Sequence, residues 1–417
     1  MSHTQNQQAV INDTAKGKVN WSAGSDSQLI ELGDGYYSAI NYGLGNAGFV
    51  ITDEGVVVID STVSAAGGEA VLAEIRKLTD LPVRYLIYTH GHEDHVGGAE
   101  VFKREGATVI GHINVAPRFD RYSRLRNHHI SINKLQFQTE DFAGDKPSYI
   151  YPDITYNQEY SFELGGRTFR LVHAKGETDD ATIVYIPEDR VVYIGDFIIW
   201  TFPNVGNPHK VLRYAREWYE TLDRVLSWQP RIIATGHGPS LTEPGIIQRA
   251  LRDTSDALRF LEEQTVYHIN KGSSEEAAIS DIQLPEHLEQ SPFLRQVYGT
   301  REFVIRGIYR RYTGWYNGNP THLAPAPQEQ VRTAVVDLIG DKDKILAKAA
   351  DLKAQGELQL ALHIADLLIG DSGMADEARS LKADLLLELA ERSENLFYHN
   401  YYKGSAEQLK PDTAAAL

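Results

Sequence analysis

The sequence contains no cysteine among its 417 residues. This absence excludes disulfide-bonded scaffolds, zinc–thiolate sites and catalytic thiols, so any metal ion must be held by histidine and carboxylate side chains. Positive charge is scarce as well, because 41 Lys and Arg stand against 57 Asp and Glu, for a formal net charge of −16. We therefore expect neither nucleic acid nor an anionic membrane surface as a partner, since both attract clustered basic residues.

Long hydrophobic runs are also missing. No stretch approaches the roughly 18 apolar residues that span a membrane. The start, MSHTQNQQAVINDTAKGKVN, lacks the basic end and apolar core of a secretory signal, so we expect a cytoplasmic protein. The 42% hydrophobic and 24% charged residues are typical of a globular chain, and the length favours two domains.

The pattern of apolar residues predicts an α/β domain followed by helices. Strand-like runs separated by turn residues alternate with helical spacing in the first part, as in GFVITDEGVVVIDS, where Asp53–Gly55 predicts a hairpin turn. Later, apolar residues recur every three and four positions, which is typical of helices. The predicted parts are a flexible arm over 1–25, a catalytic domain over 26–250, a helical connector over 251–327 and a helical domain over 328–417.

A histidine-rich stretch, YTHGHEDHVGG, follows the predicted strand VRYLIY. On a tight loop alternate side chains point the same way, so His90 and His92 can bind one ion while Asp94 and His95 face a second. Divalent first-row metals take imidazole nitrogen and carboxylate oxygen as ligands. A single loop cannot complete two such sites, so further ligands are expected elsewhere.

Suitable residues follow three later strands of the predicted sheets. Glu177 follows LVHAKG, Asp196 ends VVYIGD and His237 ends RIIATG. Strand ends are where open α/β sheets place their chemistry. The sequence does not decide which residue of this segment is the ligand, because His173, Asp179 and Asp180 could bind the same ion in place of Glu177. Asp180 is alternatively expected to hold a ligand imidazole by a hydrogen bond instead of contacting the metal.

This order of ligands resembles the metallo-β-lactamase superfamily over roughly residues 28–245. The resemblance implies an αβ/βα four-layer sandwich with a two-metal site along one edge. Most of that superfamily has histidine where Glu177 stands, and a glutamate there looks like the alkyl sulfatase branch. That branch usually bridges its metals with glutamate, whereas this chain has Asp196. The ligands implied are His90, His92, Asp94, His95, Glu177, Asp196 and His237.

The helical half strengthens the resemblance to alkyl sulfatases. The stretches VYGTREFVIRGIYRRYTGWYNGNPTHLAPAP and LKADLLLELAERSENLFYHNYYKGSAEQL look like the dimerisation domain of that branch. The resemblance implies a homodimer. The familiar sulfatases end in a sterol-carrier-like domain and carry an export signal, and this sequence shows neither, so we expect a smaller organic group than a long detergent chain.

The expected reaction is hydrolysis of sulfate esters or sulfamates by a metal-bound hydroxide. Two divalent ions bring four positive charges, which Asp94, Glu177, Asp196 and a hydroxide nearly neutralise. Such a site accepts a small anionic ester, and a bound ion lowers the pKa of water toward about 7. Asp94 and Asp196 are therefore assigned as catalytic as well as metal-binding. Zinc is the expected metal, and three carboxylates leave manganese and iron open.

Residues that bind the sulfate group are harder to predict. His209, Lys210 and Arg213 follow Asp196 closely, and the spacing of Arg213 to Trp218 matches the family. The stretch PRFDRYSRLRNHH contains Arg121 and Tyr122, although its charge is typical of a solvated loop. The candidate substrate-binding residues are His209, Arg213, Arg121 and Tyr122.

Other functions remain open. A hydrolase of phosphoesters, lactones or thioesters would share the whole metal site. A mononuclear iron dioxygenase of the same fold binds its metal through two His and one Asp, and the second ligand set of Asp94, His95 and His237 disfavours it. A non-catalytic interaction protein would have lost metal ligands, and none is missing from the sequence.

Overall fold

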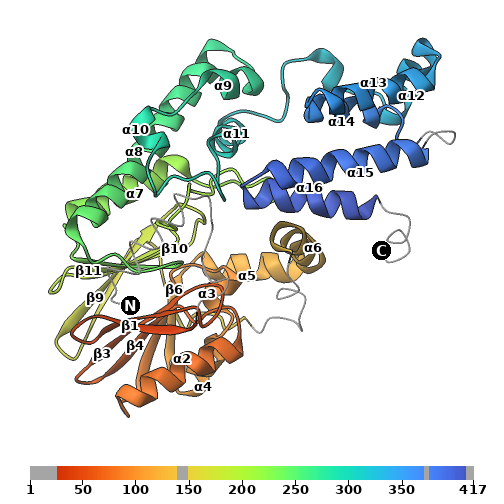
Figure 1. Ribbon diagram of the computed structural model, residues 1–417. Helices are drawn as coiled ribbons and strands as arrows, with labels where there is room; N and C mark the ends of the chain where they lie inside the picture. Colours follow the sequence, from red (N-terminus) through yellow and green to blue (C-terminus); the bar gives the residue numbers. More distant parts are fainter. Residues whose placement is uncertain (1–25, 139–148, 371–374, 410–417) are drawn as a thin grey trace. The chain divides into compact units, whose positions relative to one another are not determined.

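The computed structural model describes residues 26–138, 149–370 and 375–409 (Figure 1). Contacts between backbone positions divide the chain into two compact units. The first contains residues 1–126 and 144–313, and the second contains residues 127–143 and 314–417. The arm expected over 1–25 lies outside the described residues.

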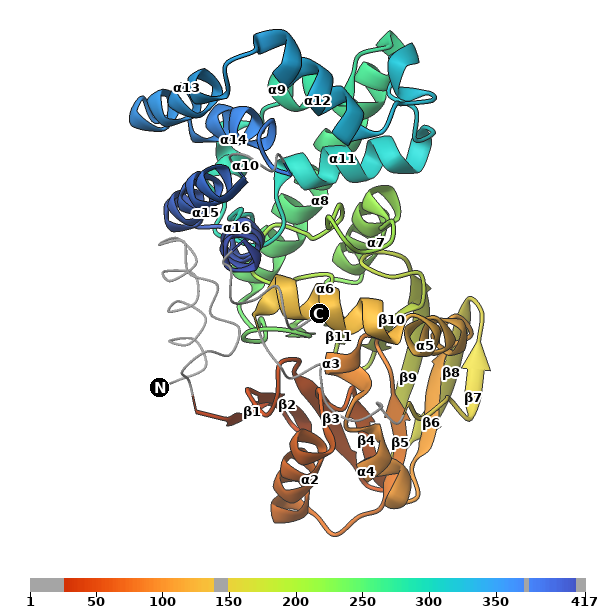
Figure 2. The same ribbon diagram turned by 90° about the vertical axis from the view of Figure 1, so that its right-hand side faces the viewer.

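Seven strands form the first sheet, in the order of the sequence (Figure 2). The first four pair antiparallel, and the last four pair parallel. The hairpin turn expected at Asp53–Gly55 is present, with Thr52 opposite Gly55. The strands are β1 Gln28–Gly33, β2 Tyr36–Ile40, β3 Ala47–Thr52, β4 Gly55–Ile59, β5 Val83–Ile87, β6 Thr108–His112 and β7 Ile154–Tyr156.

The second sheet has five strands in the order β12-β11-β10-β9-β8. Only the pair of β11 and β12 is parallel, and the connection between them contains helix α7 (Ala215–Ser227). The other neighbours are antiparallel. The strands are β8 Glu159–Leu164, β9 Arg167–Ala174, β10 Ala181–Ile186, β11 Val191–Gly195 and β12 Ile232–Thr235.

The two sheets pack face to face with helices on both outer faces. A buried cluster joins side chains of the first sheet, such as Val57 and Ile87, to Phe169 and Val184 of the second. The outer face of the first sheet is covered by α2 (Ala65–Leu78) and α4 (Ala99–Arg104), whose apolar side chains share a second cluster with β3 and β4. These layers form the αβ/βα four-layer sandwich that was expected.

A third cluster covers the outer face of the second sheet with helices α7, α8, α9 and α11. Helix α8 continues past residue 250, so the first unit extends beyond the boundary expected there. The reason is that α8 and α11 bury their apolar faces in the same core as β10 and β11. The helices are α8 Pro244–Lys271, α9 Glu275–Asp281, α10 Glu286–Glu289 and α11 Arg301–Tyr312.

The described elements of the second unit are all helices, and the sequence pattern predicts those after residue 328. One of its helices, α6 (Arg126–Phe137), comes from the middle of the chain. Its Gln136 donates to the Tyr401 hydroxyl at 2.6 Å, and the Gln136 carbonyl accepts from Asn400 at 2.7 Å. The other elements are η1 Pro320–His322, α12 Gln328–Ile339, α13 Lys342–Ala354, α14 Leu358–Asp366, α15 Ala375–Arg392 and α16 Leu396–Gln408.

The arginine-rich stretch around residue 121 is not a solvated loop, contrary to the expectation. It forms α5 (Val115–Arg124) and the start of α6. In α5 the buried side chains are Val115, Arg118, Phe119 and Tyr122, and their spacing is that of one helical face. The helix forms because this face is buried, and its arginine is neutralised by carboxylates.

None of the described helices is both long and apolar enough to cross a membrane.

Candidate metal centre

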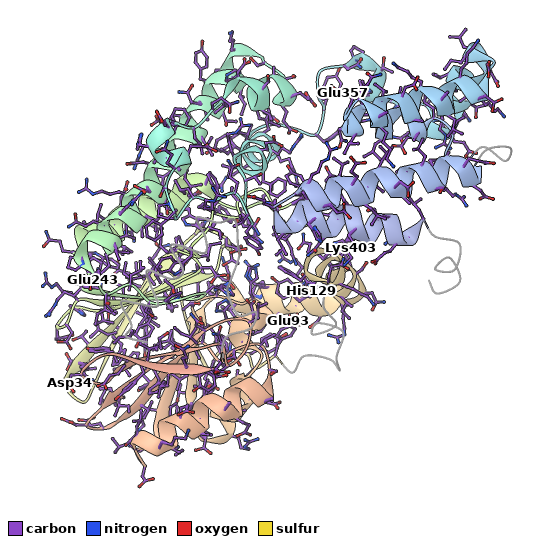
Figure 3. The ribbon with its side chains drawn as sticks, viewed as in Figure 1. Asp34, Glu93, His129, Glu243, Glu357 and Lys403 are labelled. Carbon is purple, nitrogen blue, oxygen red and sulfur yellow. The ribbon has the colours of Figure 1, made fainter. Side chains whose placement is uncertain are left out.

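The histidine-rich stretch lies where β5 ends at one edge of the sandwich. His90 is on the connecting loop, His92 occupies the N-cap of the short helix α3 (Glu93–Val96), and Asp94 and His95 lie within that helix. The turn of α3 therefore separates His90 and His92 from Asp94 and His95. A loop with alternating side chains was expected to do this. Glu93, labelled in Figure 3, accepts a hydrogen bond from the Tyr149 hydroxyl at 2.9 Å.

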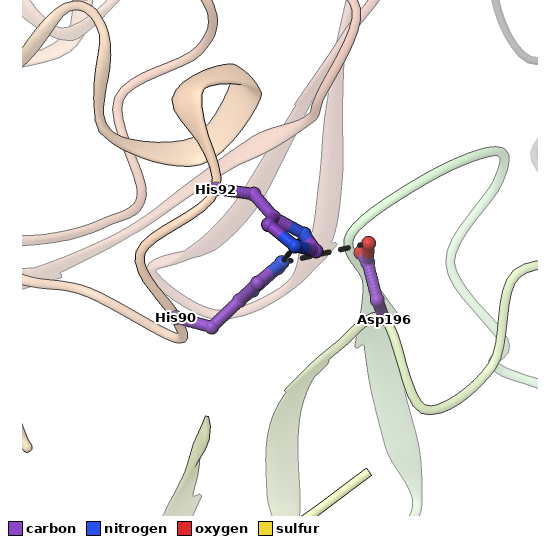
Figure 4. A group of neighbouring side chains, drawn as sticks. All are labelled: His90, His92 and Asp196. Atoms are coloured by element: carbon purple, nitrogen blue, oxygen red, sulfur yellow. Dashed lines mark hydrogen bonds and ion pairs between the residues drawn. The ribbon is translucent and has the colours of Figure 1, made fainter. Parts of the chain in front are cut away.

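The structure brings six of the seven expected ligands into two groups of three. His90, His92 and Asp196 form the first triad, and Asp94, His95 and His237 form the second. In Figure 4 the side chains of the first triad point toward one another, with His90 and His92 side by side and Asp196 facing them. Asp196 follows β11 and His237 follows β12, so two neighbouring parallel strands supply them from the second sheet.

Asp196 lies between the triads. Its Oδ2 is 3.6 Å from His90 Nε2 and 3.4 Å from His237 Nε2, and its Oδ1 is 3.4 Å from His95 Nε2. Asp94 Oδ2 completes the second triad at 3.5 Å from His95 Nε2 and 3.3 Å from His237 Nε2. One carboxylate thus faces ligand atoms of both groups.

These separations fit a metal centre. Two atoms bound to one tetrahedral ion at about 2.0–2.2 Å stand about 3.3–3.6 Å apart. His95 Nε2 and Asp196 Oδ1 are both buried, and neither has a well-aligned hydrogen bond within the described part of the chain. Buried polar atoms are normally satisfied, so a nitrogen and an oxygen that face each other in this way fit a cation between them.

The charges of the centre also favour a cation. Burial alone would raise the pKa of Asp196, yet the nearby His237, His95 and His90 hold it well below its ordinary value. The pKa of Asp94 is likewise held low against burial, by His95 and His237. Burial opposes protonation of His237, but the Asp196 and Asp94 carboxylates raise its pKa to about 9. Positive charge is stabilised here, whether protons or metal ions carry it.

In the first triad burial favours the neutral form of both histidines. Burial lowers the pKa of His90, and His95 adds to this shift. Burial also lowers the pKa of His92, together with His90 and Arg213. Their ring nitrogens, His90 Nε2 and His92 Nδ1, lie 2.9 Å apart. Neutral imidazole is the form that binds a metal ion.

Asp60 orients one ligand of the second triad. It follows β4, is buried, and its Oδ2 lies 2.9 Å from Nδ1 of His95. The Thr89 backbone N–H and hydroxyl also donate to Asp60, at 2.7 and 2.6 Å. Asp60 was not predicted from the sequence, although it follows the apolar strand GVVVI as Asp196 follows VVYIG.

Glu177 lies on the turn between β9 and β10, beside the first triad. It lines a small cavity together with His90 and Asp196. Its Oε1 forms an ion pair with Nη1 of the buried Arg213, which also donates to the Asn204 carbonyl at 2.7 Å. The Glu177 carboxylate is therefore near the centre but outside both triads, and it is paired with the Arg213 guanidinium.

The basic side chains that were expected to bind the substrate have different surroundings. Burial lowers the pKa of Arg213 to about 10. Burial also lowers the pKa of Lys210 to about 8, although the Asp94 and Glu93 carboxylates oppose the shift. Arg121 lies over the ring of Tyr122, with its Cζ 5.1 Å from the centroid. His209 is exposed, and its backbone N–H donates to Asn207 Oδ1 at 3.0 Å.

Asp180 lies behind the first triad and is fully buried. Its Oδ2 accepts the Gly91 backbone N–H at 3.0 Å and the Nε of Arg118 at 2.9 Å. It was expected to bind a ligand imidazole, but its hydrogen bond goes to the backbone between His90 and His92. This role of Arg118 was not predicted from the sequence, where the residue looks like one member of a solvated charge run.

Comparison with known proteins identifies both regions of the chain. Residues 40–237 match the family model of the metallo-beta-lactamase superfamily. Residues 275–412 match the family model for alkyl sulfatase dimerisation. The first match covers the two sheets and ends at His237, so the fold and the candidate centre define a metallo-beta-lactamase-type protein.

The chain is also similar to named sulfatases. It is 26% identical over 384 residues to a linear primary-alkylsulfatase of a Pseudomonas strain, a match that covers 86% of this chain and 72% of that protein. It is 25% identical over 412 residues to an alkyl/aryl-sulfatase of Saccharomyces cerevisiae, covering 92% of this chain but only 64% of that protein. The two family models thus place a metallo-beta-lactamase region before an alkyl sulfatase dimerisation region, and the named relatives of the chain are sulfatases.

A solved structure has the same fold. The stereoselective inverting sec-alkylsulfatase of Pseudomonas sp. superposes with a TM-score of 0.83 at 21% identity, covering 92% of this chain and 65% of that one. The chain thus spans less than two thirds of that structure's length. This likeness supports the fold of the sandwich and the helical fold of the residues that follow it.

Proposed function

We propose that this chain is a two-metal hydrolase that cleaves sulfate esters or sulfamates of small organic molecules. The observation that carries the two-metal assignment is the Asp196 carboxylate, which faces ligand atoms of both triads at 3.4–3.6 Å. The choice of a sulfate ester rests on the alkylsulfatase relatives, whose similarity runs through most of this chain.

The proposed ligands are two histidines for each ion, together with carboxylates. His90 and His92 bind one ion, Asp94, His95 and His237 bind the other, and Asp196 serves both. Glu177 is proposed to join the first ion when its carboxylate turns from Arg213. Zinc suits this set of imidazole and carboxylate ligands, and manganese or iron is compatible with its oxygen content. When bound, the ions supply Lewis acidity and a water whose pKa is lowered to about 7.

The protein's own residues are proposed to bind and orient the ester. Arg213 has five N–H donors in a rigid fork. Within the described part of the chain its Nη1 contacts both the Glu177 carboxylate and the Asn204 carbonyl. The remaining donors of this buried cation suit the oxygens of a sulfate group. Arg121, Tyr122 and His209 are proposed to contribute to the same subsite.

The overall reaction takes the ester R–O–SO₃⁻ and water to the alcohol R–OH and hydrogen sulfate. Water attacks either the sulfur or the carbon that bears the ester oxygen, and the bond from that atom to the ester oxygen breaks. Hydrolysis in ¹⁸O-labelled water separates the two courses, because the label enters sulfate in the first and the alcohol in the second. Label in neither product would rule out attack by water.

A homodimer is proposed from the second unit. Val331, Val335 and Leu338 share one face of α12, with Val331 and Leu338 exposed. An apolar stripe of this kind on the surface of a helix marks an interaction surface. It lies within the region that matches the alkyl sulfatase dimerisation model, so a second copy of the chain is the proposed occupant.

The test is a sulfate-release assay of protein loaded with zinc, manganese or iron. Short alkyl, aryl and cyclic sulfates and sulfamates are the substrates, and the matching phosphoesters, lactones and thioesters are the controls. Sulfate release with two metal ions per chain supports the proposal. Faster turnover of a phosphoester, lactone or thioester would transfer the assignment to that bond, and one iron per chain would favour the dioxygenase.

A further inference from the structure

Arg118 of α5 is a buried cation with no part in either triad. Its side chain is only 4% exposed and contacts two consecutive carboxylates. Nε donates to Asp180 Oδ2 at 2.9 Å, and Nη2 donates to Asp179 Oδ1. Such a fork binds two acceptors in fixed positions, which a lysine cannot do.

The Asp180 oxygen that binds Arg118 also accepts the backbone N–H of Gly91, at 3.0 Å. Gly91 is the residue between His90 and His92. A Cβ on Gly91 would lie 2.8 Å from Asp180 Oδ2 and 2.9 Å from Arg118 Cδ. The backbone that presents the two histidines therefore lies directly against the Arg118–Asp180 pair.

The same pair also fixes the turn that carries Glu177. Asp179 and Asp180 are two and three residues after it, and the Asp179 carbonyl accepts from Asn114 Nδ2 at 3.0 Å. Arg118 thus joins the loop of His90 and His92 to the turn of Glu177. Both of these segments contribute to the first ion in the proposed centre.

The second triad is held by other groups. Asp60 Oδ2 lies 2.9 Å from His95 Nδ1, and the Leu44 carbonyl lies 3.1 Å from His237 Nδ1. Neither of these contacts involves Arg118. Groups that orient metal ligands from behind commonly change metal affinity by about 10–100-fold when they are mutated.

We propose that Arg118 is a positioning residue for the ion held by His90 and His92, and that it does not control the other ion. This inference rests on the proposed two-metal centre and is independent of the substrate. It assigns Arg118 with Asp180 to the half of His90 and His92. Asp60 reaches both halves, because it contacts His95 directly and binds Thr89, whose hydroxyl lies 3.1 Å from His90 Nδ1.

The test measures cobalt affinity in two single-site backgrounds, by visible absorption and by competition with a chromophoric chelator. The H237A protein keeps the His90/His92 site, and the H92A protein keeps the other site. The substitution Arg118→Lys is introduced into each, because it keeps the charge and removes the fork. Arg124→Gln, on the exposed face of the same helix, is the matched control.

Arg118→Lys is expected to weaken cobalt binding about 10–100-fold in the H237A background. In the H92A background the affinity should stay within about threefold of its parent. Equal losses in both backgrounds, or no loss in the first, would overturn the assignment. Asp180→Asn should give the same selective loss of cobalt affinity. This variant replaces Arg118→Lys in the test if the lysine variant does not fold. Wild-type protein that binds no cobalt would overturn the metal centre itself, together with this inference.

Discussion

The imidazole of His95 lies 2.9 Å from Asp60, with its Nδ1 facing the carboxylate Oδ2. Both side chains are buried, and Nε2 of the same imidazole faces Asp94 and Asp196. The contact fixes which nitrogen of His95 is available to a metal ion, because a proton on Nδ1 is shared with Asp60. The support of the second triad thus comes from the end of β4.

Asp60→Asn should weaken metal binding at the second triad by about 10–100-fold, because an amide supports the imidazole less strongly than a carboxylate. Competition with a chromophoric chelator measures the affinity. Asp53→Asn, in the exposed turn between β3 and β4, is the control and should leave it unchanged. Unaltered affinity in the Asp60→Asn variant would show that His95 needs no such support.

Asp196→Asn removes the charge that faces both triads. The protein should then retain fewer than two metal ions per chain, because the remaining carboxylates no longer balance two divalent ions at close range. Elemental analysis after dialysis gives the count. Asp34→Asn, in the turn between β1 and β2, is the matched control. Two ions retained by the Asp196→Asn variant would contradict the bridging role.

Arg213→Lys should lower kcat/KM for a sulfate ester by about 100-fold, since a lysine cannot reproduce the fork of donors at a buried anion site. Steady-state kinetics separates a rise in KM from a fall in kcat. Arg216 forms an exposed pair with Glu220 on α7, so Arg216→Lys is the control for a nearby charge. A variant with unchanged kinetics would remove Arg213 from the substrate subsite.

The stacked imidazoles of His112 and His173 predict loss of stability in acid. Their centroids are 3.7 Å apart and their planes differ by 5°. His112 Nδ1 accepts the Asn114 N–H and its Nε2 faces the Asn157 carbonyl, which requires a neutral ring. Burial lowers the pKa of both, and for His112 the neighbouring His173 adds to the shift.

The folded-state pKa values lie below the ordinary value of about 6.5, so the unfolded chain binds protons first as the pH falls. The contribution of this pair is complete above about pH 6.5 and is lost below it. Melting temperatures of the metal-free protein should fall between about pH 7.5 and pH 5.5. The melting temperature of an H112N/H173N variant should fall less over this range. His363 is an exposed histidine in α14, and the His363→Gln variant should show the same fall as the unaltered protein. Equal falls in all three proteins would show that the pair does not cause the loss.

Glutamate at both Val331 and Leu338 should convert a dimer into monomers, because charge on an apolar contact face is costly to desolvate. Leu338 is 88% exposed in the single chain. Light scattering of the purified protein measures the mass. Thr333→Glu, exposed on another face of α12, should leave the dimer intact. A monomeric wild-type protein would contradict the proposed dimer directly.

The sequence predicts the sandwich and the ligand order because both depend on local patterns. Strands of apolar residues end in His90, Asp196 and His237, and parallel strands bring such ends to one edge. The helix α5 was hidden because Arg118 occupies a buried position in its apolar face. Only its contacts with Asp179 and Asp180, more than 60 positions away, make that burial possible.

The pairing of Glu177 with Arg213 depends on tertiary packing, which local sequence patterns do not predict. The residues are distant in the chain and meet where the turn after β9 approaches the segment before α7. Asp60 was accessible in principle, since it ends an apolar strand as Asp196 does. Its positive φ of 61° is rare for residues other than glycine, and the sequence does not show it.

The membership of α6 in the helical unit has a consequence for synthesis of the chain. Gln136 and its partner Tyr401 are separated by 265 positions. A ribosome adding about 5–20 residues each second releases α6 well before α16 exists. The face of α6 that carries Ile132, Asn133 and Gln136 must therefore stay without these partners until the last part of the chain has been made.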